Sequence, residues 1–307
     1  MKKVLAIVGP TAVGKTAMSI KLAKMFQGEV ISGDSMQVYR NLNIGTAKIT
    51  EEEKEGVVHH LIDVRDIDQR FSVADFVSEA TKLINEISIV GNLPIIVGGT
   101  GFYLQALLDG LDLGGDRFEN DTLRQQLLDQ AKEHGNAALH EQLERVDPQA
   151  AKKIPANNLR RVIRALEVYI KTGNRFSDQE NQPNQYDSLI IGLTTDRKKL
   201  YDRINHRVDL MMTQGLLKEA DYLYKNGGDK LQAGKGIGYH EFYDYFKSQI
   251  SLTEAVDLVK KDSRHYAKRQ LTWFRNKTKP NWYDVLDFPD YVKRLEVDVE
   301  NWLENRD

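Results

Sequence analysis

The sequence predicts an α/β fold, in which a parallel β-sheet is flanked by helices and interrupted by a helical insertion. Three observations support this prediction. A glycine-rich loop joins an apolar run to a helical pattern within residues 4–25. Strand patterns at 29–32 and 94–97 also lead into glycine-containing turns. No strand pattern occurs within 114–187. Apolar strands that alternate with helices are typical of parallel sheets buried on both faces, with ligand groups at the carboxyl ends of the strands.

The glycine-rich loop matches the phosphate-binding pattern G-x-x-x-x-G-K-[ST]. A buried strand is expected before it at residues 4–8, and helical periodicity continues through residues 17–25. In such a loop the backbone N–H groups surround an anion, Lys15 supplies a positive charge and the Thr16 hydroxyl can hold Mg²⁺. The loop therefore predicts a phosphorylated ligand and a P-loop NTPase-like core. The expected phosphate-binding residues are Gly9, Pro10, Thr11, Ala12, Val13, Gly14, Lys15 and Thr16.

The second strand pattern, residues 29–32, is followed by Gly33, Asp34 and Ser35. The Asp34 carboxylate is expected at the same sheet edge as the phosphate loop. Two chemical roles compete for it: a ligand of a metal ion, as in phosphoryl-transfer enzymes, or a general base that takes a proton from an acceptor. A third interpretation is an ordinary turn residue, because Asp is common in turns.

The third strand pattern, residues 94–97, follows a predicted amphipathic helix over 72–86, for which Ser72 and Asp75 are start signals. After it come two glycines, Thr100 and another glycine. These glycines lack the G-x-G-x-x-G spacing, so a dinucleotide site is rejected. Two interpretations remain: a turn that brings its backbone and the Thr100 hydroxyl close to a ligand, and a simple helix cap.

The insertion is predicted from a change in pattern after residue 113. Residues 121–172 are polar, charged and helical, and a strand pattern returns only at 188–193. We therefore expect a catalytic core of residues 1–113 plus 188–307 and a helical insertion domain of residues 114–187. The segment from Asn281 onward carries no motif that can be interpreted.

A long helix is expected after the 188–193 strand, and it carries Arg203 and Arg207 four residues apart. The two arginines share a helix face and can reach an anionic ligand or point to solvent. None of the seven histidines shows a metal-ligand spacing with a third partner. His206 and His240 are expected to be polar surface groups, or groups that support a ligand, rather than ligands themselves.

Composition limits the class of protein. The chain has 307 residues, 41% of them hydrophobic, no cysteine and a formal net charge of −2. We expect a soluble, cytoplasmic protein without a membrane span or disulfide. Positive charge gathers in residues 152–175 and 260–279, which favours either solvated helix faces or contact with nucleic acid.

Several further motifs lie along the chain. The phosphate loop alone is shared with many proteins, whereas D-S-M-Q-V-Y at 34–39 and A-K-R-Q-x-T-W-x-R at 267–275 are specific. N-I-G-T-A-K occurs at 43–48, R-A-L-E-V at 164–168 and G-I-G-Y at 236–239. Together these motifs resemble, nearly end to end, one family: the bacterial tRNA dimethylallyltransferases, also called tRNA isopentenyltransferases. The chain departs from the family pattern at Val13 and at His240, and it lacks the zinc finger of eukaryotic relatives.

The resemblance implies a reaction. A dimethylallyl group passes from dimethylallyl diphosphate to N6 of the adenosine 3′-adjacent to the anticodon, in tRNAs that read codons starting with U. The leaving diphosphate, rather than ATP, then occupies the phosphate loop with Mg²⁺ on Thr16. The expected partners are the tRNA anticodon stem-loop and dimethylallyl diphosphate, and a monomer is expected.

The resemblance also implies roles for residues. The catalytic residues are Asp34 as base, Thr100 beside the attacked amine and Arg207 as a clamp on the diphosphate. The expected tRNA-binding residues are Asp34, Ser35, Met36, Gln37, Thr100, Arg124, Arg160, Arg161, Arg164, Lys235, Gly236, Ile237, Gly238, Tyr239 and His240.

Two other functions are alternatives to this one. A small-molecule phosphotransferase would place ATP in the loop and use the insertion as a lid, but a lid does not need two long basic tracts. A noncatalytic RNA-binding or nucleotide-switch protein is disfavoured because no N-K-x-D motif occurs, since residues 276–279 read N-K-T-K.

Overall fold

The computed structural model describes residues 1–113, 121–181, 183, 185–287 and 290–304. The chain divides into two compact units, which we call the core unit (Met1–Leu108 with Asn184–Asp307) and the insertion unit (Asp109–Pro183). The boundaries expected from sequence, 114 and 187, lie a few residues further along the chain.

The core unit is built on a six-stranded sheet in the order β3-β2-β4-β1-β5-β6, and every strand pair is parallel. The strands are β1 Lys2–Val8, β2 Gly28–Ser32, β3 His59–His60, β4 Leu93–Gly98, β5 Tyr186–Thr194 and β6 Asn281–Asp284. The predicted parallel sheet and its four predicted strands are confirmed. The two edge strands, β3 and β6, were not predicted.

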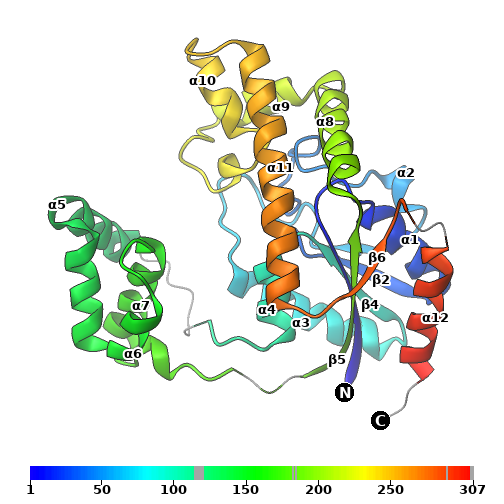
Figure 1. The fold of residues 1–307 in the computed structure, drawn as a ribbon, viewed down its shortest axis with the longest axis horizontal. Helices are drawn as coiled ribbons and strands as arrows, with labels where there is room; N and C mark the ends of the chain where they lie inside the picture. Colours follow the sequence, from blue (N-terminus) through cyan, green and yellow to red (C-terminus); the bar gives the residue numbers. More distant parts are fainter. Residues whose placement is uncertain (114–120, 182, 184, 288–289, 305–307) are drawn as a thin grey trace. The chain divides into compact units, whose positions relative to one another are not determined.

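Helices cover both faces of this sheet (Figure 1). The core-unit helices are α1 Lys15–Met25, α2 Glu51–Lys54, α3 Val73–Ile89, α4 Gly101–Leu108, α8 Arg197–Gln214, α9 Leu216–Lys225, α10 Tyr243–Phe246, α11 Leu252–Lys277 and α12 Tyr291–Glu304, with short 3-10 turns η2 Ala233–Lys235 and η3 His240–Phe242. None of the helices within the described ranges is both long and apolar enough to cross a bilayer.

Alternation along β1 explains the two-sided core. Val4, Ala6 and Val8 pack with α3 and α4, whereas Leu5 and Ile7 pack with α1 and α12. All five side chains are fully buried, and burial of each large aliphatic side chain contributes about 1.5–3 kcal/mol. The rigid central strand therefore fixes the position of the loop that follows it.

The predicted start of α3 is confirmed in atomic detail. The Ser72 hydroxyl accepts a hydrogen bond from the Asp75 backbone N–H (3.2 Å), and the Asp75 carboxylate accepts one from the Ser72 N–H (2.9 Å). This reciprocal pair is a capping box, which satisfies N–H groups that a helix start leaves without partners.

The insertion unit consists of helices α5 Asp121–Val146, α6 Pro148–Lys153 and α7 Leu159–Thr172, followed by the 3-10 turn η1 Phe176–Asp178. Its helical character agrees with the sequence prediction. Helix α5 breaks at Gly135, where φ is +83°. The unit has its own apolar core, which includes Leu143, Val162 and Leu166.

Candidate active site

Three loops meet at the carboxyl edge of the sheet. The phosphate loop leaves β1, residues 33–37 leave β2 and residues 99–101 leave β4. Backbone hydrogen bonds join the last two loops: the Gly33 N–H donates to the Val97 carbonyl (2.8 Å) and the Thr100 N–H to the Gly33 carbonyl (3.4 Å). The edge therefore gathers the groups that the sequence predicted there.

The phosphate loop depends on glycine at two positions. Gly9 has φ +148° and a Cβ there would lie 2.5 Å from the Leu193 carbonyl oxygen, while Gly14 has φ +109°. Gly14 is also the N-cap of α1, and no side chain caps this helix. The first N–H groups of α1 are thus available to an anion, as in other phosphate sites at helix N-termini.

Lys15 lies at the centre of the loop. Its ammonium group donates hydrogen bonds to the carbonyls of Gly9 (3.0 Å) and Pro10 (2.9 Å). Burial lowers the pKa of Lys15 to about 8, the Asp34 carboxylate opposes this shift and Arg207 adds to it. The structure therefore brings Lys15, Asp34 and Arg207 into one electrostatic cluster.

Arg203 and Arg207 of α8 make different contacts. Arg203 donates from Nε to the Ala12 carbonyl of the phosphate loop (2.9 Å). Burial lowers the pKa of Arg207, while the carboxylates of Asp34 and Glu53 oppose that shift. Arg203 thus supports the loop, and Arg207 supplies positive charge beside Asp34.

Asp34 forms part of a turn and still has one available oxygen. Its Oδ1 accepts a hydrogen bond from the Met36 N–H (2.8 Å), which agrees with the turn interpretation. Its Oδ2 makes no hydrogen bond within the described part of the chain. The turn therefore orients the Asp34 carboxylate and leaves its Oδ2 available for a chemical role.

Thr100 is held next to this turn. Its Oγ1 accepts from the Ser35 N–H (3.1 Å) and donates to the Ser35 hydroxyl (3.4 Å). Burial raises the pKa of Tyr266 of α11, and the neighbouring Thr100 and Gln270 side chains oppose this shift. Gln37 is fixed as well, because its Oε1 accepts from the Ser32 hydroxyl (3.0 Å).

Gln270 is a supporting residue that sequence reasoning missed. This buried side chain accepts from the Thr11 N–H (2.8 Å) and donates to the Gly99 carbonyl (3.1 Å). It thereby joins the phosphate loop to the Thr100 loop. A Cβ on Gly99 would lie 2.0 Å from the Gln270 Nε2, so a side chain there would displace this amide. The motif at 267–275 contained this residue, but spacing alone did not reveal its partners.

We expect the Gln270→Leu variant to lose about 1–3 kcal/mol of stability, because it removes the side-chain partner of the part-buried Thr11 N–H and of the buried Gly99 carbonyl. Affinity for inorganic diphosphate should fall as well, since the loop loses an anchor. Urea unfolding and calorimetry measure the two effects. Thr272→Ala is the matched control, because the hydroxyl of this exposed residue of α11 donates to the Lys268 carbonyl of its own helix. Equal stability of the two variants would contradict the assigned role of Gln270.

The 235–240 turn, expected to contact tRNA, contains both exposed and buried residues. Lys235 and His240 are exposed, whereas Tyr239 is fully buried. The Tyr239 hydroxyl donates to Glu219 (2.8 Å), whose carboxylate also accepts from the backbone N–H groups of residues 43–45. A Cβ on Gly45 would lie 2.6 Å from the Tyr239 ring. Tyr239 therefore supports the turn from inside, and only its exposed neighbours can meet RNA.

The predicted tRNA-binding arginines of the insertion unit also fall into two groups, one that bonds within the unit and one that is exposed. Arg124 donates to both oxygens of the buried Glu167 (2.8 and 2.6 Å), and Arg164 donates to the Leu113 carbonyl. Arg160 and Arg161 are exposed and form no ion pair within the described ranges. The first two arginines thus contribute to the fold of this unit, and the last two remain available to a phosphate backbone.

Some basic side chains of α11 also make contacts within the core unit. Lys260 pairs with Asp209 of α8 (2.6 Å), and Arg264 donates to Asn205 of the same helix (2.5 Å). Lys260, Arg264 and Lys268 are spaced four residues apart on α11. The first two of these three cations therefore hold α11 against α8.

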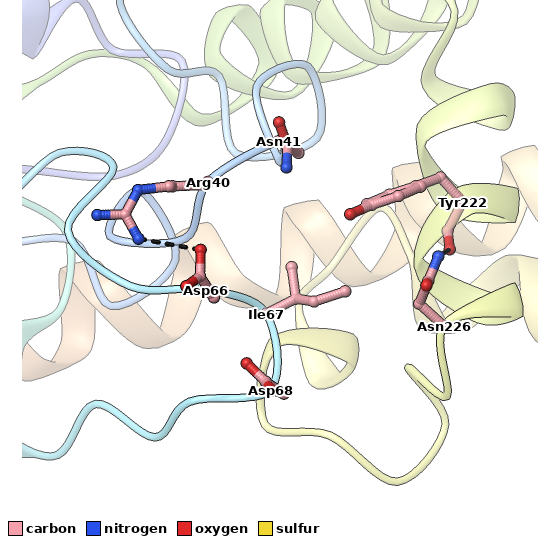
Figure 2. Close-up of a pocket in the computed structure, with 7 residues that line it drawn as sticks. All are labelled: Arg40, Asn41, Asp66, Ile67, Asp68, Tyr222 and Asn226. Carbon is pink, nitrogen blue, oxygen red and sulfur yellow. Dashed lines mark hydrogen bonds and ion pairs between the residues drawn. The ribbon is translucent and has the colours of Figure 1, made fainter.

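A surface pocket of about 380 Å³ lies elsewhere on the core unit, with Arg40, Asp66 and Tyr222 in its lining (Figure 2). Its lining contains no residue of the phosphate loop. A smaller pocket of about 280 Å³ borders the loop at Val13, Gly14 and Arg203. The first pocket therefore lies apart from the phosphate loop, and the second borders it.

Comparisons with known proteins agree with this arrangement. Residues 37–277 match the family described as IPP transferase. The chain is 58% identical over 305 residues to the tRNA dimethylallyltransferase of Limosilactobacillus reuteri, covering 99% of each chain, and 52% identical over 309 residues to that of Enterococcus faecalis, covering 100% of this chain and 99% of the other.

Solved structures give the same result. The tRNA isopentenylpyrophosphate transferase of Bacillus halodurans is 49% identical with a TM-score of 0.75, over 99% of this chain and 97% of the other. A eukaryotic dimethylallyltransferase acting on tRNA is 31% identical with a TM-score of 0.86, over 100% of this chain and 81% of the other.

Proposed function

The chain belongs to the IPP transferase family, and from this premise we infer that it transfers a dimethylallyl group to tRNA. The P-loop NTPase-like fold and the family predicted from sequence are both confirmed. The observation that carries the chemistry is the cluster of Lys15, Asp34 and Arg207 beside the phosphate loop. This cluster combines cations for a leaving anion with a carboxylate for a proton.

We propose that the donor is dimethylallyl diphosphate and that its diphosphate binds in the phosphate loop. Negative charge grows on the diphosphate as the allylic C–O bond breaks. The uncapped N-terminus of α1, the Lys15 ammonium and the Arg207 guanidinium are already in place to receive it. Groups preorganised around developing charge are a large source of rate enhancement.

The available oxygen ligands suit Mg²⁺. The Thr16 hydroxyl makes no hydrogen bond among the described residues, and the Asp34 Oδ2 is equally available. Hydroxyl and carboxylate oxygens are hard ligands of the kind that Mg²⁺ prefers. We propose that Thr16 holds this ion, with Asp34 as the alternative ligand. When bound, Mg²⁺ would neutralise charge on the diphosphate.

We propose that the acceptor is N6 of the adenosine 3′-adjacent to the anticodon. The new C–N bond forms as the C–O bond breaks, and the N6 proton passes to Asp34. The base role is supported by the orientation of Asp34 through Met36, which leaves Oδ2 available. Thr100, held by Ser35, would contact the attacked amine. One copy of the chain would bind one anticodon stem-loop, in the cytoplasm where tRNA is used.

This function is tested with labelled dimethylallyl diphosphate and an in vitro transcribed tRNA. After nuclease digestion, we expect the label on the adenosine next to the anticodon. A transcript with guanosine at that position is the matched control and should receive none. Absence of label from both transcripts, with phosphate transferred from ATP instead, would favour the phosphotransferase alternative.

The lowered pKa of Lys15 predicts an alkaline limit to diphosphate binding. The cationic form binds the anion, and the pKa of about 8 means that this form is lost well below the usual 10.5. We expect the affinity for inorganic diphosphate to fall by up to about tenfold per pH unit above that pKa. Calorimetry of the free protein across this pH range measures the decline.

Lys15→Arg is the control for this pH dependence, because a guanidinium stays charged over the whole range. Ionisation of the diphosphate itself affects both proteins equally. The decline should therefore be shallower in Lys15→Arg, and identical profiles would contradict the role assigned to the Lys15 charge.

The exposed arginines of the insertion unit predict a salt effect. We expect Arg160→Ala and Arg161→Ala each to weaken tRNA binding and to reduce the slope of log affinity against log salt by roughly one unit per lost phosphate contact. Filter binding across a salt series measures this. Lys132→Ala, an exposed cation of α5 paired with Asp129 (3.2 Å), is the comparison variant. Unchanged slopes would assign both arginines to a solvated face.

A further inference from the structure

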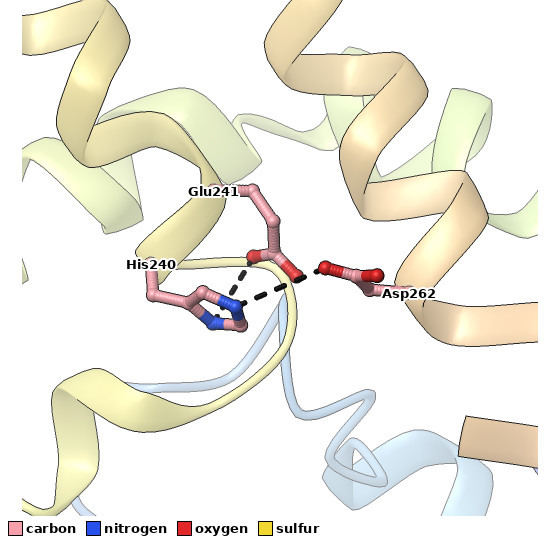
Figure 3. Close-up of side chains that lie close together, drawn as sticks. All are labelled: His240, Glu241 and Asp262. Carbon is pink, nitrogen blue, oxygen red and sulfur yellow. Dashed lines mark ion pairs between the residues drawn. The ribbon is translucent and has the colours of Figure 1, made fainter. Parts of the chain in front are cut away.

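Three side chains outside the proposed active site converge on one point of the core unit. His240 and Glu241 lie in η3, and Asp262 reaches them from α11 (Figure 3). The His240 Nδ1 lies 3.4 Å from the Glu241 Oε2, and its Nε2 lies 4.0 Å from the Asp262 Oδ2. One potential ligand atom from each residue lies within 4.8 Å of the others.

The hydrogen bonds of His240 decide which nitrogen is available. Its Nδ1 lies 2.9 Å from the Gly236 carbonyl oxygen. A carbonyl only accepts, so Nδ1 must carry the hydrogen. In the neutral ring the Nε2 then has a lone pair, and this lone pair faces the Asp262 carboxylate. Two acceptors therefore face each other with no donor between them.

Glu241 adds a separate observation that points to a ligand. The residue is only 5% exposed. Its Oε2 accepts from the Gly238 N–H (2.9 Å), but its Oε1 is buried without any partner in the described part of the chain. A buried carboxylate oxygen without a partner is costly, and in Figure 3 the Glu241 carboxylate lies between the His240 ring and Asp262.

We propose that His240, Glu241 and Asp262 form a binding site for a divalent transition-metal ion of the zinc class. One imidazole nitrogen and two carboxylate oxygens are a ligand set that Zn²⁺ accepts, with water as a fourth ligand. Mg²⁺ is disfavoured because it prefers oxygen ligands in octahedral geometry. Metal–ligand distances of about 2.0–2.2 Å bring donor atoms about 3–4 Å apart, so only small rotations of the partly exposed His240 and Asp262 are needed.

The neighbouring groups are compatible with a cation. His265 of α11 lies with Nδ1 3.7 Å from the Asp262 Oδ1. It can support the second Asp262 oxygen while the first binds the ion. A bound ion would join the 235–240 turn to α11, and would therefore order the exposed side of that turn. This site does not depend on the proposed donor or acceptor of the transfer reaction.

The alternative is a proton on His240 in place of a metal, and cobalt distinguishes the two. Co²⁺ is titrated into the full-length, tag-free protein near neutral pH, and its visible d–d absorption is recorded. We expect one equivalent to give an intense band that Zn²⁺ abolishes by displacement. Absence of the band would overturn the proposal.

Two variants assign the binding to these residues. His240→Gln and Asp262→Asn should each weaken Co²⁺ binding by at least about tenfold, the lower end of the loss expected even for a residue that only supports a ligand. His134→Gln is the matched control, since His134 is an exposed histidine beside Glu133 (3.8 Å). A band that persists in the first two variants, or that is lost in the control, would contradict the assignment.

A measurement on the unaltered chain covers the case in which a variant does not fold. Protein labelled with ¹⁵N at histidine is titrated with Zn²⁺ and followed by NMR. We expect the His240 Nε2 signal to shift while its Nδ1 remains protonated. A shift confined to other histidines would overturn the proposal.

Discussion

The Lys15→Ala variant is expected to lose dimethylallyl transfer, with a rate reduced by roughly 10³-fold or more. The Lys15 ammonium lies at the centre of the phosphate loop and shares its surroundings with Asp34 and Arg207. Without the Lys15 ammonium group, the negative charge that grows on the diphosphate loses the nearest cation that stabilises it. The rate is measured in single turnover with saturating tRNA.

Lys21→Ala is the matched control for this variant. Lys21 lies on the same helix, and its ammonium pairs with Glu296 (2.8 Å) rather than with a carbonyl of the loop. We expect near-normal transfer by the control and similar thermal unfolding of both variants, because the Lys15 contacts are with loop carbonyls rather than with the core. Transfer by Lys15→Ala within tenfold of the unaltered protein would mean that the loop does not bind the leaving group.

The Asp34→Asn variant is expected to transfer about 10² to 10⁴ times more slowly, with its Mg²⁺ dependence preserved. Asparagine keeps an oxygen that can accept from the Met36 N–H, so the turn should survive. It cannot take a proton from the adenosine amine. Single-turnover transfer across a Mg²⁺ titration measures both properties.

The same titration separates the base from the metal-ligand role. If Asp34 holds the ion, raising Mg²⁺ should partly restore the rate of the variant, because a lost ligand mainly weakens ion binding. Asp66→Asn is the control, since its carboxylate pairs with Arg40 (3.0 Å) and lies in a different turn. Near-normal transfer by Asp34→Asn at ordinary Mg²⁺ would discard both roles and leave Asp34 as a turn residue.

Features set by nearby residues could be predicted from the sequence. The phosphate loop, the capping box of Ser72 and the four inner strands follow from local patterns of glycine, capping residues and apolar runs. The edge strands could not be predicted in this way. β3 contains only His59 and His60, and β6 becomes a strand because it pairs with β5 across the sheet.

The candidate site shows the same limit. Lys15, Asp34 and Thr100 were expected at one sheet edge, because parallel strands bring their carboxyl ends together. Gln270 was missed, because its partners lie more than 150 residues away in the chain. His240 was expected to be a polar surface group, and spacing could not show that it lies near Asp262, which comes from another helix. Local spacing also could not show that Arg124 is engaged by Glu167.

The most direct test of diphosphate in the phosphate loop is the stoichiometry of the reaction without nucleotide. The protein is incubated with tRNA transcript, dimethylallyl diphosphate and Mg²⁺, and released diphosphate is counted against modified adenosine. We predict equal amounts of the two products, with no requirement for ATP, and competitive inhibition by inorganic diphosphate against dimethylallyl diphosphate. A requirement for ATP, or formation of ADP in step with tRNA modification, would contradict this assignment of the loop.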